Sequence, residues 1–230
     1  MGQMYKQSPD PLPLSMKSAI LFGASGLVGS SLLTQLLDNP AYDKIIIVVR
    51  KPLSVQHQKL TTVIGDYAAL PDLKQQLCAD EVFISLGTTK KKTPDQNEYY
   101  RIDHDYPVLA ASIAKNNGAR SVLLVSAIDA NANSKIFYVR TKGQVEADII
   151  ALGFEHTYIF RPSMLVGDRK ESRPMEKFLI GLFSLLNPLF AGSWKRFHSI
   201  HVKDLAAAMI NAANDLSVKV KRYHWQDISR

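Results

Sequence analysis

Short apolar runs alternate with longer segments of mixed polarity along most of this chain. Runs rich in Val, Ile and Leu are typical of strands that are buried on both faces, and the segments between them repeat apolar residues at helical spacing. We therefore expect strands at residues 18–22, 44–49, 60–64, 81–86, 121–125 and 156–160, and helices at 27–37, 98–117 and 138–152. This alternation predicts an α/β fold, a doubly wound parallel sheet with helices on both faces.

The alternation ends at Pro162. Beyond it we expect an apolar helix at 175–186 and another helix at 202–214, within a short C-terminal elaboration (162–230) on the substrate side of the sheet. Residues 1–16 contain three prolines and no apolar segment, which predicts a flexible N-terminal segment. No linker or repeat divides the remainder, so residues 17–230 are expected to form a single domain.

The composition excludes several classes of protein. Of the 230 residues 46% are hydrophobic and 21% are charged, which is ordinary for a globular protein. The net charge is +7, but the basic residues lie in scattered groups without interleaved aromatic residues, so we expect no nucleic acid partner. The single cysteine excludes an intrachain disulfide. Because no secretory signal is visible either, we expect a cytoplasmic protein.

An apolar stretch at residues 178–190, FLIGLFSLLNPLF, interrupts the otherwise mixed C-terminal part. It is too short to cross a bilayer. We expect it to cap the substrate pocket or to pack in the core. The alternatives are a dimer face, in a chain that is a monomer or a homodimer, and peripheral contact with a membrane surface.

Three glycines follow the first expected strand, in the segment FGASGLVGSSLL at residues 22–33. The N-terminus of the next helix offers unpaired N–H groups and a partial positive charge, which bind phosphate. Gly23 permits a tight turn, Gly26 lets a pyrophosphate approach the backbone and Gly29 lets the helix pack close to the sheet. The G-x-x-G-x-x-G spacing in this setting predicts a Rossmann-like dinucleotide-binding loop. Its cofactor-binding residues are expected to be Gly23, Ser25, Gly26, Leu27, Val28 and Gly29.

The residues that follow the other strands indicate which dinucleotide binds. Arg50 and Lys51 follow the second strand, where proteins that bind NAD usually place an acidic residue. An arginine can hold a 2′-phosphate through forked, charge-assisted hydrogen bonds, so we expect NADP (as NADPH) in preference to NAD. The alternative is a solvent-facing basic pair. Asp66 is placed to bond the adenine amino group, and the residues expected over the middle of the cofactor are Leu86, Gly87 and Thr88.

A candidate catalytic group lies at the fifth strand and the helix after it. Ser126 ends the strand, and Tyr138 and Lys142 follow at a spacing that puts both on one helix face. A free tyrosine has a pKa of about 10, and a nearby ammonium lowers that pKa. We therefore expect Tyr138 to exchange a proton with a substrate held by Ser126 while a nicotinamide exchanges a hydride. The alternative is an amphipathic helix with a half-buried Tyr and an exposed Lys.

These motifs resemble the short-chain dehydrogenase/reductases, in their extended or atypical branch. LGTTKKK, FYVRTKGQVEADI and FRPSMLVGDRKESRP are similar to sequences of the Tat-interacting-protein-like oxidoreductases. The resemblance implies a Rossmann-like fold, NADP binding, an unsettled small-molecule substrate and a possible protein partner. It also implies that Arg161 and Pro162 lie at the nicotinamide end of the cofactor. The chain departs from the family pattern at Asp103, where family members often place an Asn that supports a proton relay.

Three hypotheses for function remain open. The first is an NADP-dependent oxidoreductase that acts on a small carbonyl or alcohol through Ser126, Tyr138 and Lys142. The second is a non-catalytic NADPH-binding redox sensor that regulates a protein partner. The third is an enzyme similar to nucleoside-diphosphate-sugar epimerases, for which little chain follows Pro162. No metal is expected in any of them.

Overall fold

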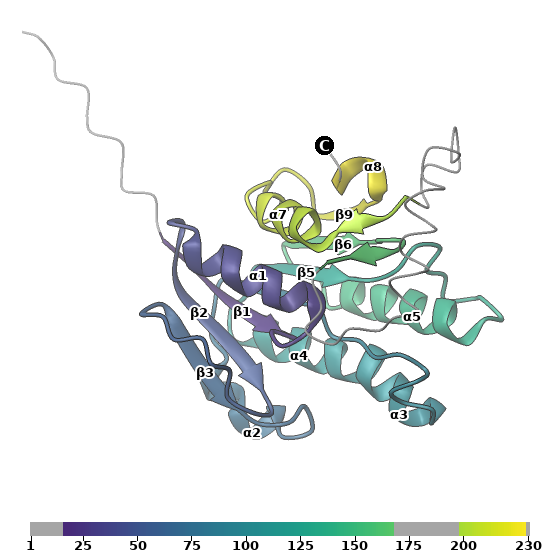
Figure 1. The fold of residues 1–230 in the computed structure, drawn as a ribbon, viewed down its shortest axis with the longest axis horizontal. Coiled ribbons are helices and arrows are strands. Elements are labelled where there is room, and N and C mark those ends of the chain that lie inside the picture. Colours follow the sequence, from purple (N-terminus) through teal and green to yellow (C-terminus); the bar gives the residue numbers. More distant parts are fainter. Residues whose placement is uncertain (1–15, 168–197, 229–230) are drawn as a thin grey trace, which may run out of the picture.

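The computed structural model describes residues 16–167 and 198–228 (Figure 1). Its centre is a seven-stranded sheet that collects apolar runs from along the chain. The strands are β1 (Lys17–Phe22), β2 (Tyr42–Val49), β3 (Leu60–Ile64), β4 (Glu81–Ile84), β5 (Ser121–Val125), β6 (His156–Phe160) and β9 (Val220–Tyr223). Two short strands, β7 (Leu165–Val166) and β8 (Ile200–His201), pair separately.

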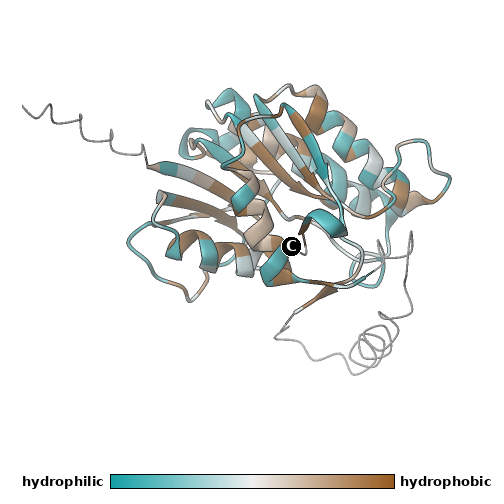
Figure 2. Ribbon diagram, turned by 90° about the horizontal axis from the view of Figure 1, so that it is seen from above, coloured by the Kyte–Doolittle hydropathy of each residue, from teal (hydrophilic) through white to brown (hydrophobic). Residues whose placement is uncertain are grey.

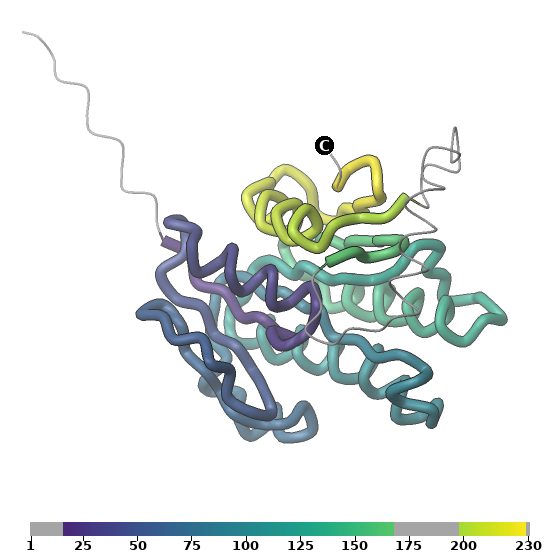
Figure 3. Tube along the Cα trace, in the orientation of Figure 1, coloured from purple at the N-terminus to yellow at the C-terminus, as the bar shows by residue number. Residues whose placement is uncertain are grey.

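The strand order is β3-β2-β1-β4-β5-β6-β9, and every neighbouring pair is parallel. The chain builds outward from β1 to β3, then crosses back to β4 and builds outward in the other direction (Figure 3). The connections that follow β1 and β4 therefore separate at the carboxyl edge of the sheet, which is where sheets of this kind bind ligands. The expected doubly wound fold is confirmed.

Helices cover both faces of the sheet, and each face has its own buried core. On one face lie α1 (Leu27–Asp38), α7 (Val202–Ala212) and α8 (Trp225–Ile228). On the other lie α2 (Leu70–Leu73), α4 (Tyr106–Asn116) and α5 (Phe137–Ala151), with α3 (Gln96–Tyr100) before α4. The strands between these layers are largely hydrophobic, and the helices carry polar residues on their outer sides (Figure 2). Burial from both sides explains why the central strands are nearly all apolar.

The long helix expected at 98–117 is interrupted. It consists of α3, a π-helical turn η2 (Arg101–Asp105) and α4. Pro107 stands in the first turn of α4 and has no N–H to donate to an earlier carbonyl. The register of the helix therefore changes before that proline, and Asp103 lies inside the turn.

Other differences concern the ends and the edge of the sheet. The strand expected at 81–86 ends at Ile84, and the strand expected at 44–49 begins at Tyr42. β9 was missed because its sequence, VKRY, has two adjacent charged residues instead of an apolar run. That composition suits an edge strand, where charge discourages pairing with another chain.

Parts of the C-terminal expectation lie beyond what the structure describes. The helix expected at 175–186, the apolar stretch 178–190 and most of segment 1–16, which we expected to be flexible, fall outside the described residues. Within residues 16–167 and 198–228, no helix is long and apolar enough to cross a membrane.

Candidate functional site

The glycine loop joins β1 to α1 at the carboxyl edge of the sheet. Gly23 has a φ of +89°, and a Cβ there would lie 2.8 Å from the Ser85 carbonyl oxygen just beyond β4. A Cβ on Gly29 would lie 1.9 Å from the Gly23 carbonyl oxygen. Only glycine fits at these two positions, because a side chain would strain the first and overlap backbone at the second. The tight turn and the close helix packing expected from the sequence are therefore both present.

The first turn of α1 exposes backbone amides to this edge. Gly26 is the N-cap, and no side chain caps the helix. The first N–H groups of a helix have no partner within it and attract anions. Ser25 and Gly26 are exposed, whereas Val28 and Gly29 are buried, so the latter two can offer only their backbone to a ligand. Together with the small glycines, this uncapped helix end fits the pyrophosphate of a dinucleotide.

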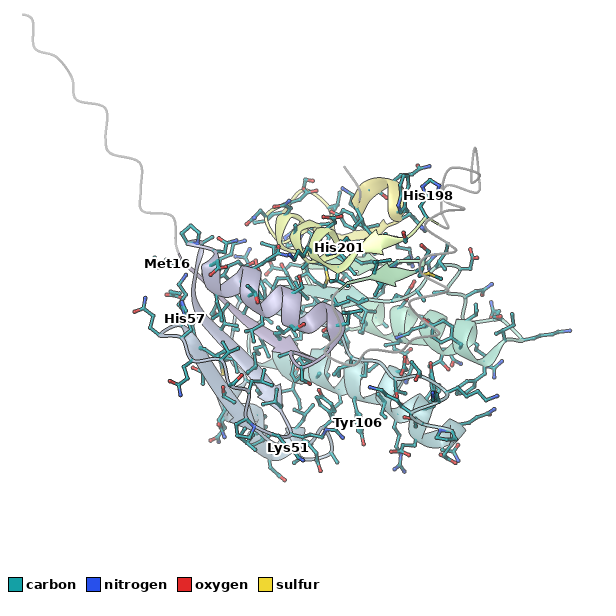
Figure 4. All side chains as sticks on the ribbon, viewed as in Figure 1. Met16, Lys51, His57, Tyr106, His198 and His201 are labelled. Carbon is teal, nitrogen blue, oxygen red and sulfur yellow. The ribbon has the colours of Figure 1, made fainter. Side chains whose placement is uncertain are left out.

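Arg50 and Lys51 are exposed just beyond the carboxyl end of β2. Figure 4 labels Lys51 and also Tyr106, at the start of α4, on the same side of the view. The Asp66 carboxylate accepts a hydrogen bond from the Ala69 N–H at 2.9 Å, so it shapes the turn before α2. The structure thus places Arg50, Lys51 and Asp66, the residues expected to select the dinucleotide, at one edge of the site. Of these, Asp66 also bonds the backbone of its own turn.

Tyr67 is a residue at this edge that the sequence interpretation missed. Its ring packs 5.4 Å from that of Tyr106. Burial raises the pKa of Tyr67, while the nearby Arg50 charge and a Gly23 backbone hydrogen bond lower it. The Tyr67 hydroxyl therefore lies near both the glycine loop and Arg50. The available signal was its position immediately after Asp66, beyond the end of β3.

The segment after β4 lies over a buried ion pair. Lys142 Nζ is 2.8 Å from Asp103 Oδ1, and both residues are almost completely buried. The other carboxylate oxygen of Asp103 accepts the Thr88 N–H at 2.7 Å. A Cβ on Gly87 would lie 3.7 Å from the Lys142 ammonium. The structure therefore brings Gly87 and Thr88 next to Lys142, although they lie far from it in the sequence, and Leu86 is buried beside them.

Tyr138 lies one helical turn before Lys142 on α5 and keeps 42% of its surface exposed. Burial raises the pKa of the Tyr138 phenol, Lys142 lowers it and Asp103 raises it, with a net increase. Because solvent reaches the ring, this increase is smaller than that of a fully buried phenol. Lys142 therefore lowers this pKa, as we expected, but it does not bring the pKa below its ordinary value. Burial and the Asp103 carboxylate outweigh the ammonium.

Ser126 belongs to a different group of side chains. Its hydroxyl donates to Glu146 Oε1 at 2.5 Å, and both residues are buried. Arg161 donates to the same carboxylate at 2.9 and 2.5 Å, and Arg222 approaches it at 3.4 Å. The Arg161 guanidinium thus holds Glu146, and the Pro162 carbonyl accepts the Ile128 N–H at 2.9 Å.

The candidate catalytic residues therefore fall into two neighbouring groups along α5. Lys142, one helical turn after Tyr138, pairs with Asp103, whereas Ser126 and Arg161 bond Glu146. Within the described residues, no hydrogen bond joins Ser126 to Tyr138 or Lys142. Glu146 was missed, although it stands four residues after Lys142, and helical spacing places it on the same face of α5.

The chain is similar in sequence to proteins named as mitochondrial. Protein fmp52, mitochondrial, of Aspergillus fumigatus is 33% identical over 207 residues, covering 86% of this chain and 87% of that protein. FMP52 of Meyerozyma guilliermondii is 39% identical over 177 residues, covering 75% of this chain and 76% of that protein. Both names carry the word mitochondrial, and this finding overturns the cytoplasmic location that we expected.

Solved structures share the fold at low sequence identity. WbmH of Bordetella bronchiseptica, in complex with NAD+, superposes with a TM-score of 0.70 at 22% identity, covering 91% of this chain and 75% of its own. A UDP-N-acetylglucosamine 4-epimerase from Methanobrevibacter ruminantium gives a TM-score of 0.66 at 19% identity, covering 91% and 76%. The family model described as NAD(P)H-binding matches residues 23–216, from the first glycine of the loop to beyond α7. The chain therefore belongs to the NAD(P)H-binding family.

Proposed function

We propose that this chain is an NADP(H)-dependent oxidoreductase of the short-chain dehydrogenase/reductase type. Tyr138 and Lys142 are its acid–base pair, and its substrate is a small carbonyl compound or the matching alcohol. The observation that carries the proposal is the pairing of these residues on one face of α5. The buried ammonium of Lys142 lies close to Gly87, at the carboxyl edge of the sheet that also carries the glycine loop. The resemblance to the Tat-interacting-protein-like oxidoreductases supports the same subgroup.

The cofactor would be held by groups that the fold already brings together. The uncapped amides of α1 suit the pyrophosphate, and Arg50 suits a 2′-phosphate, which favours NADPH over NADH. When bound, a nicotinamide cofactor supplies hydride exchange. Tyr138 supplies or receives the proton, and Lys142 keeps a positive charge next to it.

Ser126 has a supporting role in this proposal. Its hydroxyl donates a hydrogen bond to Glu146, so a substrate carbonyl could accept from Ser126 only by displacing that bond. We therefore assign the acid–base chemistry to Tyr138 and Lys142. Ser126, Glu146 and Arg161 join the carboxyl ends of β5 and β6 to α5.

A non-catalytic NADPH-binding regulator is the second candidate. This candidate is favoured because two of the expected catalytic side chains already have partners within the protein. Ser126 is bonded to Glu146, and Lys142 is paired with Asp103. The two proposals share the glycine loop and Arg50 and differ only in what Tyr138 does.

We also propose that the chain is located in mitochondria, following the names of its relatives. Fractionation of cells that express the tagged chain tests this.

The first experiment compares thermal unfolding without ligand, with NADPH and with NADH. A ligand at about a hundred times its dissociation constant adds about 2.7 kcal/mol to the free energy of unfolding. We expect the melting temperature to rise more with NADPH than with NADH. No rise with either nucleotide would overturn cofactor binding.

A screen of carbonyl compounds with NADPH then separates the two candidates. Turnover that is abolished by Tyr138→Phe supports the enzyme. Turnover that persists in Tyr138→Phe removes Tyr138 from the mechanism.

A further inference from the structure

Asp103 is buried beneath the candidate active site, with 1% of its surface exposed. It lies in the π-helical turn η2, a type of distortion that often marks functional sites. One carboxylate oxygen pairs with Lys142 at 2.8 Å, and the other accepts the Thr88 N–H at 2.7 Å. The carboxylate is thus held in one orientation and connects α5 to the segment after β4.

We propose that Asp103 is a positioning residue whose carboxylate holds the Lys142 ammonium and keeps Tyr138 protonated, so that Tyr138 is the proton donor in the reduction of a carbonyl group. The inference rests on the proposed function, because it assigns a direction to the proton exchange of Tyr138. Of the two substrates that the proposed function allows, a carbonyl compound or the matching alcohol, it selects the carbonyl compound.

The charges around Tyr138 carry this inference. The titratable groups that face it in the described structure are Lys142 from α5, Asp103 from η2 and Tyr99 from α3. An unpaired ammonium would strongly favour the phenolate. With Asp103 2.8 Å from Lys142, the carboxylate offsets part of the effect of the ammonium on the phenol. Burial and Asp103 together keep the pKa of Tyr138 above its ordinary value.

A phenol, unlike a phenolate, can act as an acid. During reduction the carbonyl carbon gains a hydride from the reduced nicotinamide, and the carbon–oxygen π bond breaks. The oxygen then takes the proton of the Tyr138 hydroxyl, which leaves an alcohol and a phenolate that regains a proton from water. Oxidation of an alcohol would instead require the phenolate at the start. Asp103 disfavours that state, so the protein is mainly in the protonated form that carbonyl reduction requires.

The test measures the titration of Tyr138 without cofactor or substrate. Fluorotyrosine incorporated at position 138 reports this one phenol by fluorine NMR. The comparison is made in a Lys142→Met background, where no ammonium can change its own charge during the titration. Adding Asp103→Asn, which keeps an oxygen for the Thr88 N–H, should move the titration to lower pH. A titration midpoint of Tyr138 that stays unchanged or moves to higher pH would overturn the proposal.

A second background keeps the test decisive if Lys142→Met does not fold. Lys142→Arg supplies a cation that does not lose its proton in this range. Asp103→Asn should again move the Tyr138 titration to lower pH, and no movement would overturn the proposal. Glu155→Gln is the matched control, because it removes an exposed carboxylate that pairs with Arg120 and should leave Tyr138 unchanged.

Failure of this inference can be told apart from failure of the proposed function. If NADPH raises the melting temperature while Asp103→Asn leaves the titration unchanged, cofactor binding stands and the role of Asp103 is wrong. If the titration moves but no nucleotide binds, the proposed function fails although the electrostatic effect of Asp103 is present.

Discussion

The Ser126 hydroxyl donates a hydrogen bond to the Glu146 carboxylate across 2.5 Å, and both groups are buried. A hydrogen bond to a buried charge stabilises a fold more than a bond between neutral groups does. The bond links the end of β5 to the middle of α5. A residue that the sequence suggested for substrate binding thus contributes to the stability of the site, which leads to the first prediction.

Ser126→Ala should lower the free energy of unfolding by about 2 kcal/mol, because it removes one donor from a buried carboxylate. NADPH affinity should stay close to that of the unmodified protein. Urea unfolding and a fluorescence titration measure the two effects. Ser30→Ala is the control, since its hydroxyl is exposed and bonds only the Leu27 carbonyl. Unchanged stability together with a large loss of NADPH affinity would contradict the supporting role.

Arg161→Ala should destabilise the protein by about 3 kcal/mol or more, because it leaves Glu146 charged and poorly paired in the core. Adding Glu146→Gln to Arg161→Ala should recover part of this loss, since the buried charge is then gone. Thermal unfolding of the single and double variants provides the measurement. Arg120→Ala removes an exposed ion pair with Glu155 and should change little. Equal losses of stability in Arg161→Ala and Arg120→Ala would contradict the prediction that the loss depends on burial of the ion pair.

Arg50→Asp should weaken NADPH binding by about tenfold or more, because a charge-assisted contact to the 2′-phosphate is replaced by repulsion. NADH affinity should fall less or rise. Fluorescence titrations with both nucleotides measure the ratio. Lys44→Asp makes the same charge change at the exposed amino end of β2 and is the control. A ratio that changes equally in both variants would remove Arg50 from cofactor selection.

The Glu81 carboxylate should make stability depend on pH. Burial raises the pKa of Glu81 above its ordinary 4.5, although Lys17 and Tyr42 lower it through hydrogen bonds at 2.8 and 2.5 Å. The folded protein therefore binds this proton more tightly than the unfolded chain. The contribution of Glu81 is complete below the unfolded pKa and is lost as pH rises through the folded one.

Urea unfolding of the protein and of Glu81→Gln over that range tests this dependence. The stability difference between the two should move in favour of the variant as pH rises. Glu155→Gln is a control of opposite sign, because hydrogen bonding from Arg120 lowers the pKa of exposed Glu155. A stability difference for Glu81→Gln that stays constant with pH would contradict the prediction.

Local pattern was sufficient for the main elements of this fold. Apolar runs located six of the seven strands of the main sheet, because strands buried on both faces need continuous apolar sequence. The glycine loop could be read in the same way, since Gly23 and Gly29 meet backbone at distances that no side chain tolerates. Tyr138 and Lys142 could be assigned to one helix face because residues four apart on a helix are neighbours on its surface. β9 escaped because an edge strand does not need an apolar run.

By itself, then, the sequence determined the parallel sheet, the dinucleotide-binding loop at its carboxyl edge and the pairing of Tyr138 with Lys142, because each depends on residues close together in the chain. The tertiary structure alone decided which distant groups these residues meet. Asp103 pairs with Lys142, and Glu146 accepts a hydrogen bond from Ser126. A buried charge requires a partner, but helical and strand periodicity do not say which one, because the partner arrives from another element only when the layers pack.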